Sequence, residues 1–402
     1  MTFVNILNWL PDDFDIVLTQ YILTHLLTSI VVGWTSPSSP ARPVALASII
    51  KLSVSLQSIV TTWADQRPLA TIILLFTWLT AATALDLFFI TKATYGEHTQ
   101  WLQERKMGFE PTFLHRLNWA LQMPMNYRRI NTKWQISQIP PFDSDVPDYV
   151  PTKTVFLLHR LLTTILGFGA FFYFWVNPVT MPHSSGDNPY VLLDGCDFSL
   201  NALLSRFYIV AFFIGAIFTG HTAEYAAASV IFVSLNLSDP DDWPPFQRPV
   251  TGTWTVRRLW GHTWHQSLRA FLQHNTDVVV FTLLRLPPRK VYTRYTRFFL
   301  CFIQSGILHS AFDAGWGVTS LQNGAFLLFS IQPLGFAVEE FVTWVCNRYG
   351  LFVRDGPLRT LVGYTWVVLW CTATWPIWIY PELKNMVERG ADVPFLHLKY
   401  VG

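Results

Sequence analysis

Two groups of residues in this chain have the types and spacing for chemistry. Residues 254–265 hold three tryptophans, two arginines and two histidines in a polar stretch between hydrophobic runs. About forty residues later, His309 stands alone inside a hydrophobic run. An ionisable side chain is costly to place in an apolar environment, so its presence there is by default a sign of a functional site.

A buried histidine of this kind can serve as a general base. A neutral imidazole accepts the proton of a hydroxyl group as that oxygen attacks a carbonyl carbon, and desolvation favours the neutral form. Asp313 lies one helical turn beyond His309 on the same face. It either fixes the tautomer of the ring or faces a wet cavity, and the bland alternative for His309 is a hydrogen bond to a neighbouring backbone carbonyl.

The composition indicates a membrane protein. Of the 402 residues, 51% are hydrophobic and only 13% are charged, and the mean hydropathy is +0.30. The net charge of +2 and the lack of a separate basic patch give no argument for nucleic acid binding. The four cysteines stand in unrelated contexts and form no disulfide framework. The N-terminus lacks a basic region, so we expect the first hydrophobic run to be a retained span.

Eight uncharged or nearly uncharged runs are long enough to cross a bilayer, which needs about 20 residues. They are residues 16–34, 44–63, 70–90, 155–176, 207–235, 298–318, 324–345 and 360–381. The fifth run is long enough to tilt or to break near 220–224. Residues 277–286 are apolar but too short to span, which favours a re-entrant or interfacial segment. We therefore expect an all-α polytopic protein with about eight transmembrane helices and interfacial helices around an intramembrane reaction chamber.

The distribution of charge predicts three segments and their orientation. Residues 1–95 form N-terminal transmembrane helices, 96–153 a cytosolic interfacial segment with an amphipathic helix near 113–121, and 154–402 a core. Within the core, loop 236–276 is expected on the cytosolic side, like the basic residues 285–297, whereas the acidic residues 177–197 are expected on the opposite side.

This topology separates the two groups of residues in depth. A helix that enters the membrane at Arg297 and rises about 1.5 Å per residue carries His309 to about 18 Å, near the midplane. His262 and His265 stay at the cytosolic mouth. The arrangement suits a reaction between a water-soluble anionic donor and a lipophilic acceptor.

The chain resembles the membrane-bound O-acyltransferases, in particular their wax synthase-like branch in fungal secondary metabolism. The resemblance rests on residues 242–246, 257–266 and 305–309, and it extends to residues 116–134. Such proteins often read Arg-Gly-Ile-Gly where this chain reads Arg128-Arg129-Ile130-Asn131. Glycines would permit another group to approach the backbone closely, and without them this chain is not expected to allow the same approach.

The resemblance implies acyl transfer from a coenzyme A thioester to a hydroxyl group in the endoplasmic reticulum. His309 would be the catalytic base and His265 its partner, which positions the thioester or stabilises the oxyanion. Trp264 and Gln266 flank His265 and would support it. No permanently bound cofactor or metal is implied, and acyl-CoA is a co-substrate. We expect acetyl-CoA with a terpenoid or meroterpenoid alcohol, and a long-chain acyl donor that gives a wax or sterol ester is the alternative.

The remaining polar residues each have two interpretations. Arg257 and Arg258, with Trp260, would grip the phosphates of the donor, or the arginines merely follow the positive-inside rule. His262 belongs to the site or to an aromatic anchoring belt at the interface. His221 and Glu224 have the spacing of a metal pair or proton relay, or they bond each other or a neighbouring helix. The cluster of residues 262–265 is a poor zinc site because it lacks an acidic or cysteine ligand at suitable spacing.

Two other classes of function fit the composition less well. A transporter would use the intramembrane charges as a pathway, but the two halves show no paired repeats and residues 254–265 would have no role. A membrane terpene cyclase would need carboxylate-rich motifs, and residues 239–242 are the only acidic cluster. Acyl length depends on the depth of a tunnel between several helices, and no local motif specifies it.

Overall fold

The computed structural model describes residues 10–63, 67–105, 110–176, 199–318, 323–350 and 356–388. Every regular element in these ranges is a helix, which confirms the all-α class. The chain forms two compact units, both discontinuous in sequence. Unit 1 comprises Met1–Ile136 and Ser267–Ser330, and unit 2 comprises Ser137–Gln266 and Ile331–Gly402.

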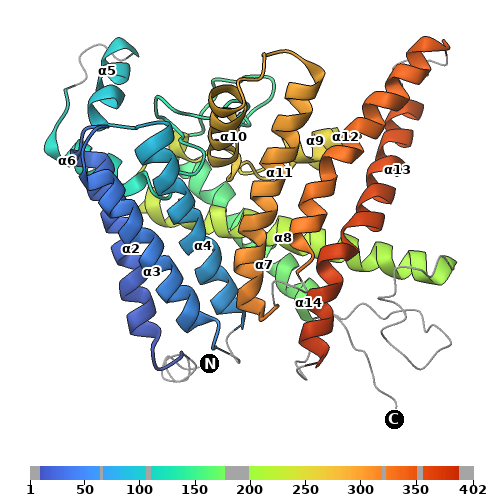
Figure 1. The fold of residues 1–402 in the computed structure, drawn as a ribbon, viewed down its shortest axis with the longest axis horizontal. Helices are drawn as coiled ribbons and strands as arrows, with labels where there is room; N and C mark the ends of the chain where they lie inside the picture. Colours follow the sequence, from blue (N-terminus) through green and yellow to red (C-terminus); the bar gives the residue numbers. More distant parts are fainter. Residues whose placement is uncertain are drawn as a thin grey trace. The chain divides into compact units, whose positions relative to one another are not determined.

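Three long apolar helices begin unit 1. They are α2 (Phe14–Trp34), α3 (Ala41–Val60) and α4 (Arg67–Leu85), and α4 continues as the π-helix η1 (Asp86–Ile90). They lie side by side, in blue, in Figure 1. The share buried against protein is 61% for the third of these spans and 28% for the second. The apolar residues of α3 therefore have a large face left for lipid.

Two short helices follow in the polar segment, α5 (Tyr95–Arg105) and α6 (Phe113–Gln122). The side chain of Thr112 caps α6 by accepting a hydrogen bond from the His115 amide at 3.1 Å. The predicted helix near 113–121 is confirmed. Its Ala120 packs closely against Gly33 of α2, where an added Cβ would approach the Ala120 Cβ to 2.8 Å.

The rest of unit 1 carries His309. Helix α10 (Arg269–Asp277) continues as the π-helix η6 (Val278–Leu283), so the short apolar segment of 277–286 is helical over most of its length. Helix α11 (Val291–Asp313) and the short η7 (Ala314–Trp316) cover the predicted sixth span. Thr276 of α10 accepts a hydrogen bond from Gln304 of α11 at 2.8 Å, and Gly315 of η7 lies directly against Thr71 of α4.

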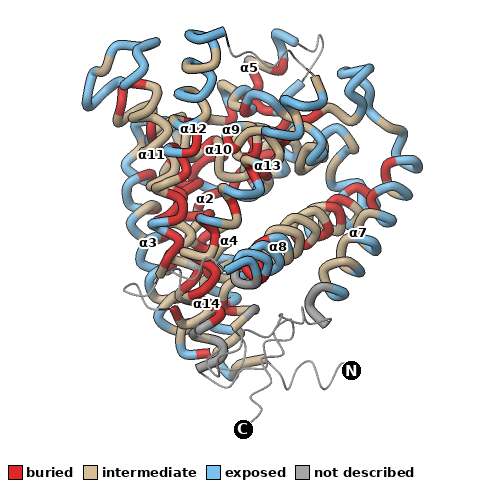
Figure 2. Tube along the Cα trace, turned by 90° about the vertical axis from the view of Figure 1, so that its right-hand side faces the viewer, coloured by how far each residue is buried: buried red, intermediate tan, exposed pale blue. Residues whose placement is uncertain are grey.

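Unit 2 is built on a pair of long helices, α7 (Lys153–Val176) and α8 (Leu200–Ser234). The helix α8 runs unbroken through 220–224. At Gly220 the Phe171 ring of α7 lies 3.2 Å from where a Cβ would stand, so the glycine permits close packing of the two helices. Only 11% of the α7 span is buried, and Figure 2 shows exposed and intermediate residues along most of its length. This face is suited to lipid.

Short helices and two C-terminal helices complete the second unit. The short ones are η3 (Pro240–Asp242), η4 (Val250–Gly252), α9 (Val256–Arg258) and the π-helix η5 (Leu259–Thr263), and the C-terminal ones are α13 (Pro357–Thr374) and α14 (Pro376–Glu388). The predicted eighth span is therefore two helices, since Pro376 cannot continue the hydrogen-bond ladder of α13. The boundary between the two units along the chain falls within helix α12 (Ala325–Arg348), after Ser330.

Six helices in the described ranges are long and apolar enough to cross a membrane. They are Phe14–Trp34, Ala41–Val60, Leu69–Ile90, Lys153–Tyr173, Leu203–Ser234 and Ala325–Arg348. The protein is thus a multi-pass membrane protein. The other two predicted spans fall on α11 and on α13 with α14, which are helical but more polar. The predicted loop of 177–197 lies outside the described residues.

Candidate functional site

His309 lies in the last two turns of α11, and its ring is held in one tautomer. Its Nδ1 atom lies 2.8 Å from the carbonyl oxygen of Ser305, one turn earlier. A carbonyl oxygen only accepts hydrogen bonds, so Nδ1 is the N–H donor and the lone pair of the neutral ring is on Nε2. The ring also packs on Phe329, at 4.1 Å between centroids. The geometry therefore suits a base that acts through Nε2.

Asp313 is oriented by the segment after α11. Its side chain is buried, and its Oδ2 atom accepts a hydrogen bond from Asn323 Nδ2 at 2.8 Å. The side-chain oxygen of Asn323, Oδ1, in turn accepts from the Ser310 hydroxyl at 3.1 Å and from the Ala325 backbone amide at 2.8 Å. The described contacts thus place Asp313 in a polar link between the end of α11 and the start of α12, while Ser305 fixes the tautomer of His309.

In unit 2, the loop that contains residues 254–266 is fastened to α12 by two acceptors, the half-buried Glu339 and the buried Gln332. Glu339 accepts from the backbone amides of Val256 and Arg257 and from the Trp366 indole at 2.9 Å. Gln332, fully buried, accepts from the indoles of Trp260 at 3.0 Å and of Trp370 at 2.9 Å. A carboxylate or amide that accepts several N–H groups fixes the loop in register with the helix.

The tryptophans of the loop form a stack against the end of α13. Trp260 lies parallel to Trp375 at 6.1 Å between centroids, and Trp264 meets Trp375 nearly edge-on at 5.7 Å. The Gln266 amide donates to the carbonyl oxygens of Trp260 and Trp264. Gln266 and Trp264 are both buried, so the residues on either side of His265 belong to the packed interior of the loop. His262, half-buried, lies in η5 within the same segment.

The two arginines of the loop differ. Arg258 donates from Nε to the Gly252 carbonyl oxygen at 2.6 Å, and its guanidinium lies over the Trp254 ring at 3.9 Å. Arg257 has 51% of its side chain exposed and lies 3.6 Å from Glu340. The geometry gives Arg258 a structural task and leaves Arg257 accessible to solvent.

Aromatic rings enclose the His265 imidazole. Phe246 stacks on it at 5.7 Å with an angle of 14°, and His221 of α8 meets it edge-on at 5.1 Å. Phe246 is itself stacked on Tyr225 at 4.8 Å. In the described part of the chain, no hydrogen bond joins His221 to the exposed Glu224, and no group of three histidine, cysteine, aspartate or glutamate side chains could hold a metal. His221 belongs to the surroundings of His265.

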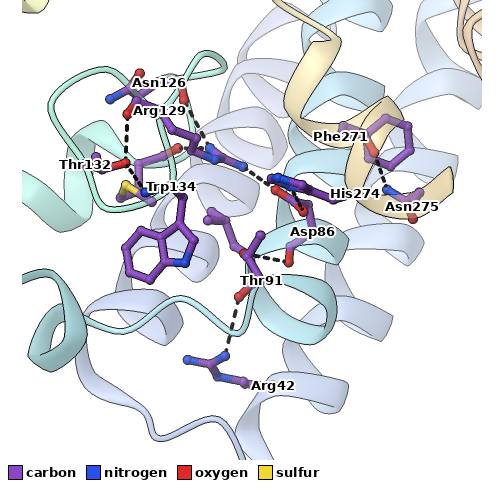
Figure 3. A network of polar contacts seen from close by, with 12 residues as sticks. Arg42, Asp86, Thr91, Asn126, Arg129, Thr132, Trp134, Phe271, His274 and Asn275 are labelled. Carbon is purple, nitrogen blue, oxygen red and sulfur yellow. Dashed lines mark hydrogen bonds and ion pairs between the residues drawn. The ribbon is translucent and has the colours of Figure 1, made fainter. Parts of the chain in front are cut away.

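The resemblance motif of residues 126–132 is anchored by a buried ionic network, shown in Figure 3. Asp86 accepts from Arg129 Nη2 at 3.0 Å and from His274 Nδ1 at 2.9 Å. The Asp86 and Arg129 side chains are 0% and 1% exposed. The network joins the end of α4, the loop after α6 and the helix α10. Sequence patterns do not reveal this network, because its members are separated by 43 and by 188 residues.

The same loop explains the missing glycines. Arg129 and Asn131 have φ angles of +57° and +56°, in the left-handed region. Glycine enters this region without steric cost, and asparagine enters it more readily than most other residues. The two positions therefore require a backbone conformation. This chain keeps the left-handed conformation without glycine, with Arg129 held by Asp86.

Comparison with known proteins identifies relatives of this chain. Residues 243–331 match the membrane bound O-acyl transferase family. The acetyltransferase atnC of Arthrinium sp is 27% identical over 302 residues, which cover 73% of this chain and 69% of that protein. The acetyltransferase aurG of Calcarisporium arbuscula is 27% identical over 73% of this chain and 72% of its own length.

A shorter and more similar match is the acetyltransferase pyr8 of Aspergillus fumigatus, which is 34% identical over 41% of this chain and 39% of its own length. No solved structure matches. The family match spans the loop of residues 254–266 and the histidine of α11. Together with the multi-pass helical fold, these matches support an O-acyltransferase enzyme that is similar to the membrane bound O-acyl transferase family over residues 243–331 and to fungal acetyltransferases over most of its length.

Proposed function

We propose that the protein transfers an acetyl group from acetyl-CoA to a hydroxyl group of a lipophilic terpenoid or meroterpenoid alcohol. The names of the relatives as acetyltransferases support the donor. Their occurrence in fungi supports an acceptor from secondary metabolism, and we also propose that the protein resides in the endoplasmic reticulum. The loops of 100–140 and 239–273 are proposed to face the cytosol, because coenzyme A is anionic and water-soluble.

His309 is the proposed general base. Nε2 removes the proton of the acceptor hydroxyl as its oxygen attacks the thioester carbonyl carbon. The tetrahedral intermediate collapses with cleavage of the carbon–sulfur bond, and the imidazolium returns the proton to the departing thiolate. His265 is proposed to hold the thioester carbonyl and to stabilise its developing negative charge. Ser305 holds the His309 ring, and Trp264, Gln266 and Asp313 are proposed to support the two histidines through the loop and the helix that carry them. Arg257 is a proposed contact for the donor phosphates.

The observation that carries this proposal is the hydrogen bond from His309 Nδ1 to Ser305, because it leaves the lone pair on Nε2. The chain offers a matched control for the alternative that His309 only forms a structural hydrogen bond with a backbone carbonyl. His25 of α2 makes the same contact with the carbonyl oxygen of Tyr21, at 3.1 Å, but its Nε2 atom lies 3.2 Å from the Thr80 hydroxyl. Both ring nitrogens of His25 thus lie close to groups of the surrounding helices, and no catalytic role is proposed for this residue.

The test compares His309→Ala with His25→Ala in microsomes supplied with acetyl-CoA and candidate alcohols. We expect His309→Ala to lower kcat by about 10²–10⁴-fold, as for the loss of a general base, and to remain inserted. His25→Ala should keep kcat within about threefold of wild type per folded molecule. Equal losses in the two variants would refute the catalytic role. Turnover with palmitoyl-CoA in preference to acetyl-CoA would refute the proposed donor.

A further inference from the structure

The neighbourhood of His265 contains polar atoms that the protein itself does not satisfy. His221 of α8 makes no hydrogen bond through either ring nitrogen to any described residue, and its Nδ1 atom is inaccessible to solvent. Its ring lies 5.1 Å from that of His265. Buried polar groups without partners are rare in folded proteins, and each one indicates a missing water or ligand.

A second unsatisfied group lies on the other element that surrounds His265. Gln247 follows Phe246, the residue stacked on His265, and its buried Nε2 atom has no partner in the described part of the chain. The other polar atom of this side chain, Oε1, has one long contact, 3.4 Å from the hydroxyl of Thr222. That hydroxyl has a single proton, which it donates to the Phe218 carbonyl oxygen at 2.7 Å. The Gln247 amide therefore retains its hydrogen-bonding capacity.

Packing holds both groups in place without satisfying them. Arg160 of α7 donates to the Trp243 carbonyl oxygen, and Tyr225 of α8 donates to the Pro244 carbonyl oxygen at 3.1 Å. These contacts fasten the loop of 243–247 to the pair of long helices. Gly167 lets α8 approach α7 closely at Ala223, where an added Cβ would lie 2.8 Å from the Ala223 Cβ. The unsatisfied atoms are thus preorganised on a rigid frame.

We propose that His221 and Gln247 form, with His265, a polar subsite that hydrogen-bonds the carbonyl and amide groups of the acyl donor. An amide N–H pair and a neutral imidazole offer donors for carbonyl oxygens, and the ring also offers an acceptor for an amide N–H. Phe246 and Trp264 pack against the His265 ring, and Tyr225 stacks on Phe246. These rings leave less room for water, which strengthens such bonds. Coenzyme A carries two amides beside the thioester, whereas a terpenoid alcohol offers few such groups. The subsite therefore belongs to the donor, and the inference rests on the proposed function.

The test separates donor binding from turnover. We would measure binding of radiolabelled acetyl-CoA to detergent-purified protein that carries His309→Ala, so that no turnover occurs. Adding His221→Phe or Gln247→Leu should weaken acetyl-CoA binding by about three- to tenfold, as expected for one lost neutral hydrogen bond. In the active enzyme, the same changes should raise the KM for acetyl-CoA and leave the KM for the alcohol unchanged. His221→Asn, which keeps a donor and an acceptor, should recover part of the binding.

The matched control is Thr219→Val, which removes a hydroxyl from the same helix. That hydroxyl bonds only the backbone carbonyls of Gly215 and Ala216, so donor binding should be unchanged. Normal acetyl-CoA binding by both subsite variants would show that water fills the subsite and would overturn the inference. A rise in the KM for the alcohol alone would assign the subsite to the acceptor and overturn it too. No acetyl-CoA binding by His309→Ala without further changes would instead refute the proposed donor.

Discussion

Replacing Asp86 by asparagine should be among the most destabilising single changes in this protein. Asp86 is the carboxylate facing Arg129 in the buried network of Figure 3, where the two side chains are 0% and 1% exposed. Asp86→Asn leaves the guanidinium charge buried without its counter-ion. Breaking a buried ion pair from one side costs about 3–5 kcal/mol, because desolvation of the remaining charge is no longer offset.

The cost translates into a measurable melting shift. Unit 1 contains about 200 residues, and for a unit of that size each kcal/mol lowers the Tm by about 2–4 °C. We therefore expect Asp86→Asn to lower the Tm by about 6–20 °C. The Tm is measured by fluorescence-detected size-exclusion chromatography of heated, detergent-solubilised protein. The matched control is Glu97→Gln. Glu97 pairs with Lys133 at 3.1 Å, but both side chains are more than 40% exposed, so its loss should cost less than about 1 kcal/mol.

A double variant tests the reasoning itself. Arg129 has a φ of +57°, a left-handed conformation that costs about 1–2 kcal/mol for a residue with a Cβ. Arg129→Gly therefore removes both the buried charge and this conformational cost. Asp86→Asn combined with Arg129→Gly should therefore melt at a higher temperature than Asp86→Asn alone. The argument fails if Asp86→Asn melts within 2 °C of wild type, or if adding Arg129→Gly lowers the Tm further.

Two further predictions use residues of the helix α5 and of the loop 254–266. Burial beside His115 lowers the pKa of His98 from 6.5 to about 4, so the folded state binds fewer protons than the unfolded state between these values. Stability should be complete above pH 6.5 and fall by up to about 3 kcal/mol as the pH decreases toward 4. His98→Phe lacks this loss, so the Tm of wild type relative to that of His98→Phe should decrease as the pH decreases. Arg258→Gln should lower the Tm with little change in the KM for acetyl-CoA, since its guanidinium bonds Gly252, whereas Arg257→Gln should raise that KM in a salt-dependent way without lowering the Tm; the opposite pattern in kinetics and melting would reverse the two roles.

The membrane helices could be predicted from the sequence because hydrophobic length is a local property. The first five predicted spans and the seventh each fall on one of the six helices that are long and apolar enough to cross a membrane. The errors arise where polarity and proline enter. Within the predicted eighth span, helix α13 ends at Thr374 and helix α14 begins at Pro376. Average hydropathy does not reveal this break.

The candidate site was only partly predictable, because its support comes from distant residues. The spacing of residues 262–265 and of His309 was visible in the sequence. The acceptors that fix the loop, Gln332 and Glu339, lie 72 and 83 residues from the donors Trp260 and Val256. Ser305 was within reach of inference, since a histidine in a helix commonly bonds the carbonyl oxygen one turn earlier, as His25 also does.

Arg129 shows why a departure from a family motif has to be interpreted through the backbone. A sequence comparison records two absent glycines, and the structure shows that both positions are left-handed. The strain at Arg129 is offset by its bonds to Asp86 and to the carbonyl oxygens of Met123 and Asn126. The same guanidinium balances the charge of Asp86, which in turn orients His274. One substitution relative to the motif therefore carries a compensating set of contacts that involves the end of α4, the loop after α6 and the helix α10, and the loop keeps the motif's conformation without its glycines.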